Sequence, residues 1–249
     1  MKPVPVIAID GPSASGKGAV ARLVAERLGF WYLDSGAIYR AAAVAAARAG
    51  IALAEPSASV TALVACARVM NLRFEGDRVL LDDDDVTAAV RSEAGGRDAS
   101  RIATLANVRS ALLSRQREFR RPPGLVADGR DMASVVFPDA ALKVFLTADV
   151  IERAHRRVRQ LGAQKNPAES PNGLIEKENN ATIRAPFDTD GAKVLADLME
   201  RDRRDAERSE APLKQVADAR LLDTTSLSID QAVDAVLDWF RDRPTSPGG

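Results

Sequence analysis

The chain has 249 residues, with 35 basic and 35 acidic side chains, and 46% of its residues are hydrophobic while only 4% are aromatic. This length allows one large α/β domain or one domain with inserts, and the alanine-rich composition favours closely packed helices. The balanced charge argues against a dedicated binder of nucleic-acid polymers or anionic membranes, although it allows a local basic cleft. Because Cys66 is the only cysteine, an internal disulfide and a thiolate zinc site are excluded.

The sequence shows no signal peptide and no apolar run long enough to span a bilayer, so we expect a cytoplasmic protein without a membrane partner. Nothing in the chain marks a large apolar interface, which makes a monomer the plainer expectation. Residues 242–249 have the composition of a flexible tail.

The first predicted element is a buried strand at Val4–Ile9, which a glycine-rich loop follows directly. From Gly11 the spacing G-x-x-x-x-G-K is that of a phosphate-binding loop, whose backbone N–H groups converge on an anion while Lys17 reaches the outer phosphates. A helix predicted at Lys17–Leu28 completes the motif, which a glycine-rich turn beside an unrelated lysine would not explain. We expect ATP to be bound by Gly11, Pro12, Ser13, Ala14, Ser15, Gly16, Lys17, Gly18 and Ala19.

The two positions after Lys17 lack the hydroxyl that often holds magnesium in such loops, because Gly18 and Ala19 stand there. Mg²⁺ would therefore be held by the nucleotide, water and carboxylates, with help from Ser13 or Ser15. The candidate metal ligand is Asp128, directly or through water, because it ends a later strand of the sheet.

The next stretch, LDSGAIYR, opens a helix with Asp34, Ser35 and Gly36 and places Tyr39 and Arg40 one turn in. Backbone donors, a hydroxyl and a guanidinium would surround one small anionic group there.

Between residues 54 and 94 the pattern changes, and NLRFEGDRVLLDDDDV predicts a β-hairpin around EGD, in an insert beside the core. Its acidic run, Asp82–Asp85, is interpreted as a solvated turn rather than a metal site, because four adjacent carboxylates seldom converge on one ion.

The segment ASRIATLANVRSALLSRQREFR predicts one helix, in which Ser100 and Arg109 lie two and a half turns apart. They would not share one face, and only a ligand or a bend would bring both to one site.

Further strands at Leu125–Ala127, Leu142–Leu146 and Arg220–Leu222 alternate with helices, which predicts a parallel sheet with its active site at the carboxyl ends. LVADGRDM continues from such a strand end into Arg130 and Asp131, an arrangement suited to phosphate binding, although a plain Asp-Gly turn is the alternative.

Residues 162–191 lack a strong period, and the helices on either side, ERAHRRVRQ and MERDRRDAERSE, are rich in arginine. We interpret the region as a lid that closes over phosphates, while a merely solvated arginine face is the alternative.

IDGPSASGKG, LDSGAIYR, VRSALLSRQREFR, ADGRDMASVVFPDA and the ERDRRD segment together resemble the bacterial cytidylate kinase family, over nearly the whole chain. The resemblance implies a three-layer P-loop nucleoside monophosphate kinase fold, with a parallel central sheet, a monophosphate-binding insert containing a small antiparallel sheet, and a helical lid. The expected division is a core of residues 1–53, 95–150 and 211–241, an insert at 54–94 and a lid at 151–210. The implied activity, part of pyrimidine metabolism, transfers the γ-phosphoryl group of ATP, with Mg²⁺, to CMP or dCMP.

The resemblance also implies roles for individual residues. Ser35, Arg40 and Arg130 would hold the acceptor phosphate, Ser100, Arg109 and Asp131 the cytosine, and Arg201 and Asp205 the ribose, with Arg208 nearby. Asp34 and Tyr39 complete the expected substrate-binding set, and the expected catalytic residues are Lys17, Arg130, Asp131 and Arg201. The arginine that acts on the transferred group stays open among Arg153, Arg156, Arg157, Arg184 and Arg201.

The cytosine assignment agrees with the chemistry of the base. Its amine donor and two acceptors match the carboxylate of Asp131 and the donors of Arg109 and Ser100, whereas uracil would set an oxygen against Asp131. Two features depart from the family pattern: Ala19 stands where threonine is usual, and residues 162–191 are longer than the expected lid.

Two other functions are compatible with a phosphate-binding loop. A kinase for UMP or a sugar acid would not need a carboxylate facing an amine. A nucleotide-dependent switch would not need two arginine-lined sites, and the chain has no N-K-x-D motif for guanine.

Overall fold

The computed structural model describes residues 3–53, 56–76, 78–165, 189–208 and 210–243. Its parallel central sheet has the order β2-β6-β1-β7-β8. The strands are β1 (Val6–Asp10), β2 (Trp31–Asp34), β6 (Leu125–Gly129), β7 (Leu142–Thr147) and β8 (Arg220–Asp223). A smaller antiparallel sheet contains β3 (Leu72–Glu75), β4 (Arg78–Leu81) and β5 (Asp84–Asp85). The predicted α/β class, with a parallel central sheet and a small antiparallel sheet, is confirmed.

The central strand β1 is buried on both faces. Val6 and Ala8 pack into one hydrophobic cluster, whereas Ile7 and Ile9 pack into the other, because successive side chains of a strand point to opposite sides. A strand that is buried on both sides has a continuous apolar sequence, which is why VIAI predicts it.

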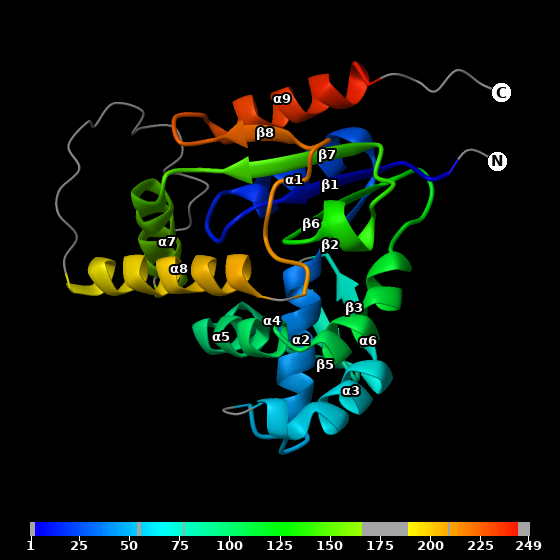
Figure 1. The fold of residues 1–249 in the computed structure, drawn as a ribbon, viewed down its shortest axis with the longest axis vertical. Coiled ribbons are helices and arrows are strands. Elements are labelled where there is room, and N and C mark those ends of the chain that lie inside the picture. Colours follow the sequence, from blue (N-terminus) through cyan, green and yellow to red (C-terminus); the bar gives the residue numbers. More distant parts are fainter. Residues whose placement is uncertain (1–2, 54–55, 77, 166–188, 209, 244–249) are drawn as a thin grey trace.

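Helices cover both faces of this sheet (Figure 1). On one face, α1 (Lys17–Leu28) packs against α9 (Ile229–Arg241). On the other, α2 (Ser35–Arg48) leaves the sheet and contacts four helices: α3 (Val60–Val69), α4 (Thr87–Arg91), α5 (Glu93–Ile102) and α6 (Ala106–Arg117). The alanines buried along α2 allow this close approach, as the composition predicts. The last pair, α7 (Val150–Lys165) and α8 (Thr189–Glu207), pack on each other.

The predicted hairpin is confirmed as β3 and β4, with Gly76 in its turn at φ 59°. The acidic run Asp82–Asp85 is exposed and forms the turn into β5, as expected, with Asp82 and Asp83 at positive φ. Asp84 accepts a hydrogen bond from Arg48 at 3.0 Å, so the run also ties this sheet to α2.

The prediction of one helix from Ala99 to Arg120 is wrong, because α5 ends at Ile102 and α6 begins at Ala106. The hydroxyl of Thr104 donates to the carbonyl oxygen of Arg101 at 2.7 Å, and the Leu105 N–H donates to that of Ile102 at 3.1 Å. Such local bonds compete with helix propagation and turn the chain.

Two smaller differences concern the extent of the predicted elements. Sequence analysis misses β2, an edge strand of four residues whose Trp31 is 54% exposed and which therefore lacks a buried pattern. The segment predicted as irregular from Gly162 to Gly191 is helical at both ends, to Lys165 and from Thr189. Its middle, like the predicted tail from residue 244, lies outside the described residues.

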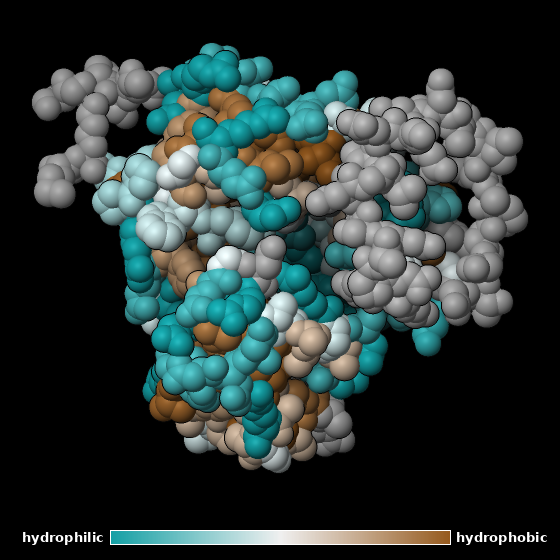
Figure 2. All heavy atoms as spheres, turned by 180° about the vertical axis from the view of Figure 1, so that it is seen from behind, coloured by the Kyte–Doolittle hydropathy of each residue, from teal (hydrophilic) through white to brown (hydrophobic). Residues whose placement is uncertain are grey.

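Hydrophobic residues on the surface are scattered rather than gathered. Most of the face in Figure 2 is hydrophilic, with smaller hydrophobic areas between. The large exposed hydrophobic residues, Trp31, Val69, Met199, Leu221 and Ile229, lie on five different elements. No helix among the described residues is long and apolar enough to cross a bilayer.

Gly11 lies where the phosphate-binding loop passes the end of β7, and a Cβ atom there would come within 1.9 Å of the Leu146 carbonyl oxygen. We expect Gly11→Ala to destabilise the protein by several kcal/mol, because the backbone of β7 must move. The matched change Gly96→Ala, in α5 with nothing within 4 Å, should be neutral or stabilising by up to about 1 kcal/mol. Urea unfolding compares the two, and equal stability would contradict the packing at Gly11.

Asp10 is a carboxylate buried at the end of β1, and it accepts hydrogen bonds from the N–H groups of Met132 and Ala133 at 2.9 and 2.8 Å. Burial raises its pKa to about 6, while these two amides counteract the rise. The folded protein therefore holds this proton more tightly than the unfolded chain, and the resulting stability is present below pH 4 and lost as pH rises through 6. We expect the stability of the wild type, relative to Asp10→Asn, to fall by about 2 kcal/mol between pH 4 and pH 7. Urea unfolding at both pH values would show no such change if Asp10 were solvated.

Candidate active site

Three carboxylates stand at the carboxyl ends of neighbouring strands of the sheet. Asp34 ends β2 and lies opposite Asp128 in the register with β6, while Asp10 ends β1 opposite Gly129. This edge is where parallel sheets place their ligands. The predicted location of the site is thus set by strand register.

The loop between β1 and α1 has the backbone of a phosphate cradle. Ala14 and Gly16 both have positive φ, at 57° and 91°, which turns their neighbouring N–H groups toward a common centre. Lys17 begins α1 and donates to the carbonyl oxygen of Pro12 at 3.3 Å. The Ser15 hydroxyl is fully buried without a hydrogen-bond partner, so it is available to a ligand.

Asp128 and Lys17 lie together beneath this loop. Burial, and then the neighbouring Asp34, raise the pKa of Asp128 to about 7, whereas burial and Arg130 lower that of Lys17 to about 7. A Cβ atom at Gly18 would approach Oδ2 of Asp128 at 3.2 Å. The glycine after Lys17 therefore leaves room for this carboxylate, at the position where other phosphate loops carry a hydroxyl.

These residues fit a magnesium ion held mainly by nucleotide and water. Mg²⁺ usually keeps several waters and takes one or two carboxylates besides phosphate oxygens. The buried Asp128 carboxylate and the unpartnered Ser15 hydroxyl suit that mode. Within the described ranges no group of three or more metal-ligating side chains occurs, which such a site does not require.

The start of α2 forms the second part of the site. Asp34 caps the helix by accepting a hydrogen bond from the Ala37 N–H at 2.9 Å, and it accepts a second hydrogen bond from Nη2 of Arg40 at 2.8 Å. The Nε of Arg40 is buried without a partner. Ser35 is buried against Gly129, where a Cβ atom would come within 2.5 Å of its hydroxyl. The predicted cluster of a helix N-terminus, hydroxyl and guanidinium is therefore assembled.

Four arginines converge between the sheet and α8. Burial, and then the charge of Arg130, lower the pKa of Arg201 to about 10, and Arg40 and Arg157 act in the same direction. Arg130 donates to Asp205 at 2.8 Å and to the Ser13 hydroxyl at 2.8 Å, while the Nε of Arg201 is buried without a partner. Asp34, Asp205 and Glu93 offset this positive charge in part. A cluster of this kind is suited to an anion.

Two of the three residues expected to read a base, Arg109 and Asp131, come together. Arg109 and Asp131 form a buried ion pair, and the guanidinium of Arg109 lies 5.9 Å from the ring centroid of Tyr39. The bend after α5 lets Arg109 donate to the carbonyl oxygen of Ala103 at 3.3 Å. The Ser100 hydroxyl is buried and unpartnered on α5. The chain bends between Ser100 and Arg109, which a shared site for the two residues requires.

Arg208 lies near this pair, since Arg109, Asp131 and Asp205 all affect its pKa, although burial is the main reason that the pKa is lowered. Its Nη2 is buried without a partner. Five buried polar atoms on residues expected to contact a ligand therefore lack a protein partner, namely those on Ser15, Arg40, Ser100, Arg201 and Arg208. Native proteins rarely leave such atoms unpaired, so they indicate a ligand.

The arginines of α7 contact the protein rather than an open site. Arg153 donates to the carbonyl oxygen of Ser13 at 3.2 Å and to Asp202 on α8 at 2.6 Å. Arg156 donates to the carbonyl oxygens of Ser15 and Thr224 at 3.2 and 2.6 Å. These bonds join α7 and α8 to the phosphate-binding loop.

The remaining arginines considered for the transferred group differ in their surroundings. Arg157 forms an ion pair with Glu93 on α5 and donates to Gln160. Arg184 lies outside the described residues. Arg201 alone among the four described candidates has a buried donor without a partner, the Nε named above.

Sequence analysis misses Asp10 and Thr224. Thr224 is 4% exposed, and its hydroxyl donates toward the carbonyl oxygens of Ser15 and Thr147. A signal existed for both, because each stands at or directly after the carboxyl end of a strand.

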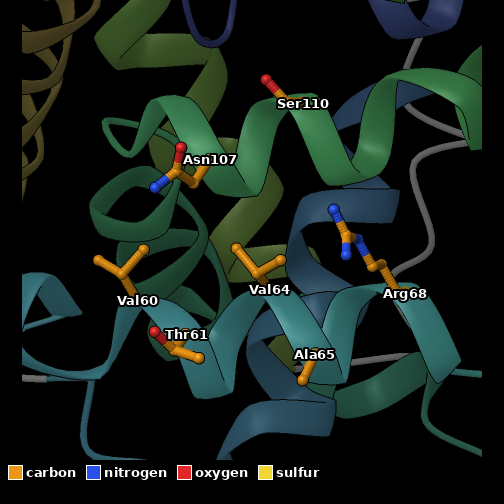
Figure 3. Close-up of a pocket in the computed structure, with 7 residues that line it drawn as sticks. All are labelled: Val60, Thr61, Val64, Ala65, Arg68, Asn107 and Ser110. Atoms are coloured by element: carbon orange, nitrogen blue, oxygen red, sulfur yellow. The ribbon is translucent and has the colours of Figure 1, made fainter.

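A cavity of about 350 Å³ lies apart from these residues, between α3 and α6. Figure 3 shows its lining, which includes Val64, Arg68 and Asn107. None of the predicted site residues lines it.

A model of the cytidylate kinase family matches residues 7–180 and 170–242. A relative named "Cytidylate kinase" from Burkholderia ambifaria (strain MC40-6) is 51% identical over 96% of this chain and 94% of its own length. A relative of the same name from Bordetella bronchiseptica is 49% identical over 95% of this chain and 95% of its own length. Another, from Chromobacterium violaceum, is 49% identical over 98% of this chain and 98% of its own length. A solved Thermus thermophilus structure aligns over 96% of this chain and 98% of its own, with 18% identity and a TM-score of 0.39, which is too low to bear on the fold. The family model and the relatives span nearly the whole sequence, and the chain belongs to the cytidylate kinase family.

Proposed function

We propose that this protein transfers the γ-phosphoryl group of ATP to CMP and dCMP, giving ADP and CDP or dCDP. The observation that carries the proposal is the buried Arg109–Asp131 pair, with the unpartnered Ser100 hydroxyl, next to a cluster of arginines. Together these groups offer an acceptor for the cytosine amine, donors for its ring edge and positive charge for its phosphate.

ATP would bind on the loop from Gly11 to Ala19. The loop N–H groups and the N-terminus of α1 face the phosphates, and Lys17 reaches toward the outer ones. Kinases generally take ATP with a divalent cation, and in this chain Asp128 and Ser15 would hold Mg²⁺ directly or through water. The bound ion supplies neutralisation of phosphate charge.

CMP would bind on the opposite side of the arginine cluster. Ser35, Arg40 and Arg130 would hold its phosphate, supported by Asp34, and Arg201 and Asp205 its ribose. The base would meet Asp131, Arg109 and Ser100, with Tyr39 and Arg208 around them. In this arrangement Arg130 would release Asp205 or Ser13 to reach the phosphate, because it donates hydrogen bonds to both in the structure.

The chemistry requires positioning and charge neutralisation rather than a general base, since the attacking oxygen of the CMP phosphate is already ionised. Lys17 and Arg130 would balance charge on the transferred group. We assign the arginine that acts on that group to Arg201, because its Nε is buried, unpartnered and close to Arg130 and Lys17.

The helices α7 and α8 would act as the lid, and the small antiparallel sheet with its helices as the monophosphate-binding insert. Closure would exclude water, which limits wasteful ATP hydrolysis. The scattered exposed hydrophobic residues support a monomer. A cytoplasmic location remains part of the proposal.

A coupled assay of ADP formation tests the proposal, with ATP and Mg²⁺ and with CMP, dCMP, UMP, AMP or no acceptor. We expect rapid ADP formation with CMP and dCMP only. Equal ADP formation without an acceptor would indicate an ATPase or a switch. Equal rates with UMP would keep the kinase activity and contradict the base-reading assignment.

A further inference from the structure

Asp10 is a buried charged group that the proposed mechanism does not use. Its carboxylate is 3% exposed and binds the N–H groups of Met132 and Ala133, one with each oxygen. Within the described part of the chain, no salt bridge includes it. The nearest charges acting on it are Asp131, which is unfavourable, and Arg130, which is favourable.

The two amides belong to a single π-helical turn, η2 (Met132–Val136). Inside this turn the N–H groups of Val136 and Phe137 donate to the carbonyl oxygens of Asp131 and Met132, at 3.1 and 2.7 Å. The first N–H groups of any helical turn have no partner within it. Asp10 supplies that partner from a different strand.

Asp131 stands directly before this turn, at φ −149° and ψ 21°. Its backbone is therefore fixed on one side by β6, which ends at Gly129, and on the other by the two amides that Asp10 holds. Its side chain extends to Arg109. A shift of η2 by a fraction of an ångström would change the direction of the Asp131 carboxylate.

A buried carboxylate without a cation lowers the stability of the folded protein, and an apolar residue at this position would lower it less. The two amides alone do not require a full charge, because a neutral acceptor also satisfies them. This loss of stability indicates that the protein requires two acceptor oxygens in one fixed orientation at this position.

We propose that Asp10 is a positioning residue for base specificity, which holds η2 so that the Asp131 carboxylate faces the amine of a cytosine base. The inference rests on the proposed function, because Asp131 must read the base for its position to matter. It predicts that Asp10 controls discrimination between CMP and UMP while leaving ATP binding unchanged.

The test compares Asp10→Asn with the wild type. The amide side chain keeps the shape of Asp10 but sets an N–H donor against one of the two backbone donors. We expect the CMP-to-UMP ratio of kcat/KM to fall about tenfold, with the KM for ATP within twofold of the wild type. Amide hydrogen exchange should accelerate in a peptide covering residues 130–137. The control is Asp218→Asn. Asp218 precedes β8, is exposed and pairs with Lys143, and its replacement should change neither the CMP-to-UMP ratio nor the exchange of residues 130–137.

A double variant separates positioning from a general loss of stability. Because Asp10 acts through Asp131, Asp10→Asn combined with Asp131→Asn should discriminate no worse than Asp131→Asn alone. An additive loss would overturn the inference, as would an unchanged ratio in Asp10→Asn. If Asp10→Asn does not fold, Asp10→Ser replaces it, because serine keeps one acceptor oxygen. If neither variant folds, the role of Asp10 is stability alone, which would also overturn the inference. A wild type that does not distinguish CMP from UMP would instead contradict the proposed function itself.

Discussion

Replacing Lys17 with methionine should lower kcat for CDP formation on the order of 10³-fold, because in the proposed arrangement the lysine charge would face the outer phosphates of ATP. Methionine keeps most of the aliphatic stem, so the packing beneath the loop changes little. Phosphate oxygens would stabilise the charged form of Lys17, whose pKa is lowered to about 7 by burial and by Arg130. The loss should appear in kcat more than in the KM for CMP.

Steady-state kinetics of Lys17→Met, with saturating CMP and ATP, measure this effect. Lys143→Met is the matched control, because Lys143 lies on β7 and pairs with Asp218 away from the loop. A kcat for Lys17→Met within tenfold of the wild type would exclude Lys17 from the transfer step.

Replacing Asp131 with asparagine should lower kcat/KM for CMP roughly 10³-fold and remove most of the discrimination against UMP. The amide would present a donor at the place where, in the proposed arrangement, the carboxylate would accept a hydrogen bond from the cytosine amine, and that donor would suit the uracil oxygen. Arg109 also loses its buried partner, so some loss of stability accompanies the change.

The controls for this variant separate folding from recognition. Affinity for ATP should stay within a few fold of the wild type, and Asp139→Asn, a change to an exposed carboxylate paired with Arg120, should affect neither nucleotide. A CMP-to-UMP ratio that Asp131→Asn leaves unchanged would show that another group reads the base.

Local motifs predicted much of this site. The loop from Gly11 to Lys17, the cap at Asp34 and the strand end at Asp128 are each set by neighbours within a few residues, so spacing alone places them. The central strands follow from their apolar runs, because burial on both faces leaves no polar positions.

The parts that the sequence did not predict depend on distant contacts. Arg130 pairs with Asp205, and Arg153 with Asp202, across separations that no local pattern encodes. The bend after Ile102 is closed by local hydrogen bonds from Thr104 and Leu105 in an otherwise helical sequence, and β2 is short and exposed at the sheet edge. Asp10 is visible as a strand-end carboxylate, but its partners at Met132 and Ala133 appear only when β1 and β6 lie side by side.

The most direct measurement follows the phosphoryl group itself. With ATP labelled at the γ-phosphate and with CMP as acceptor, the label should appear in CDP, in a one-to-one ratio with the ADP formed, and not as inorganic phosphate. Label released mainly as inorganic phosphate, or transferred equally to UMP, would contradict a kinase whose Arg109–Asp131 pair selects cytosine.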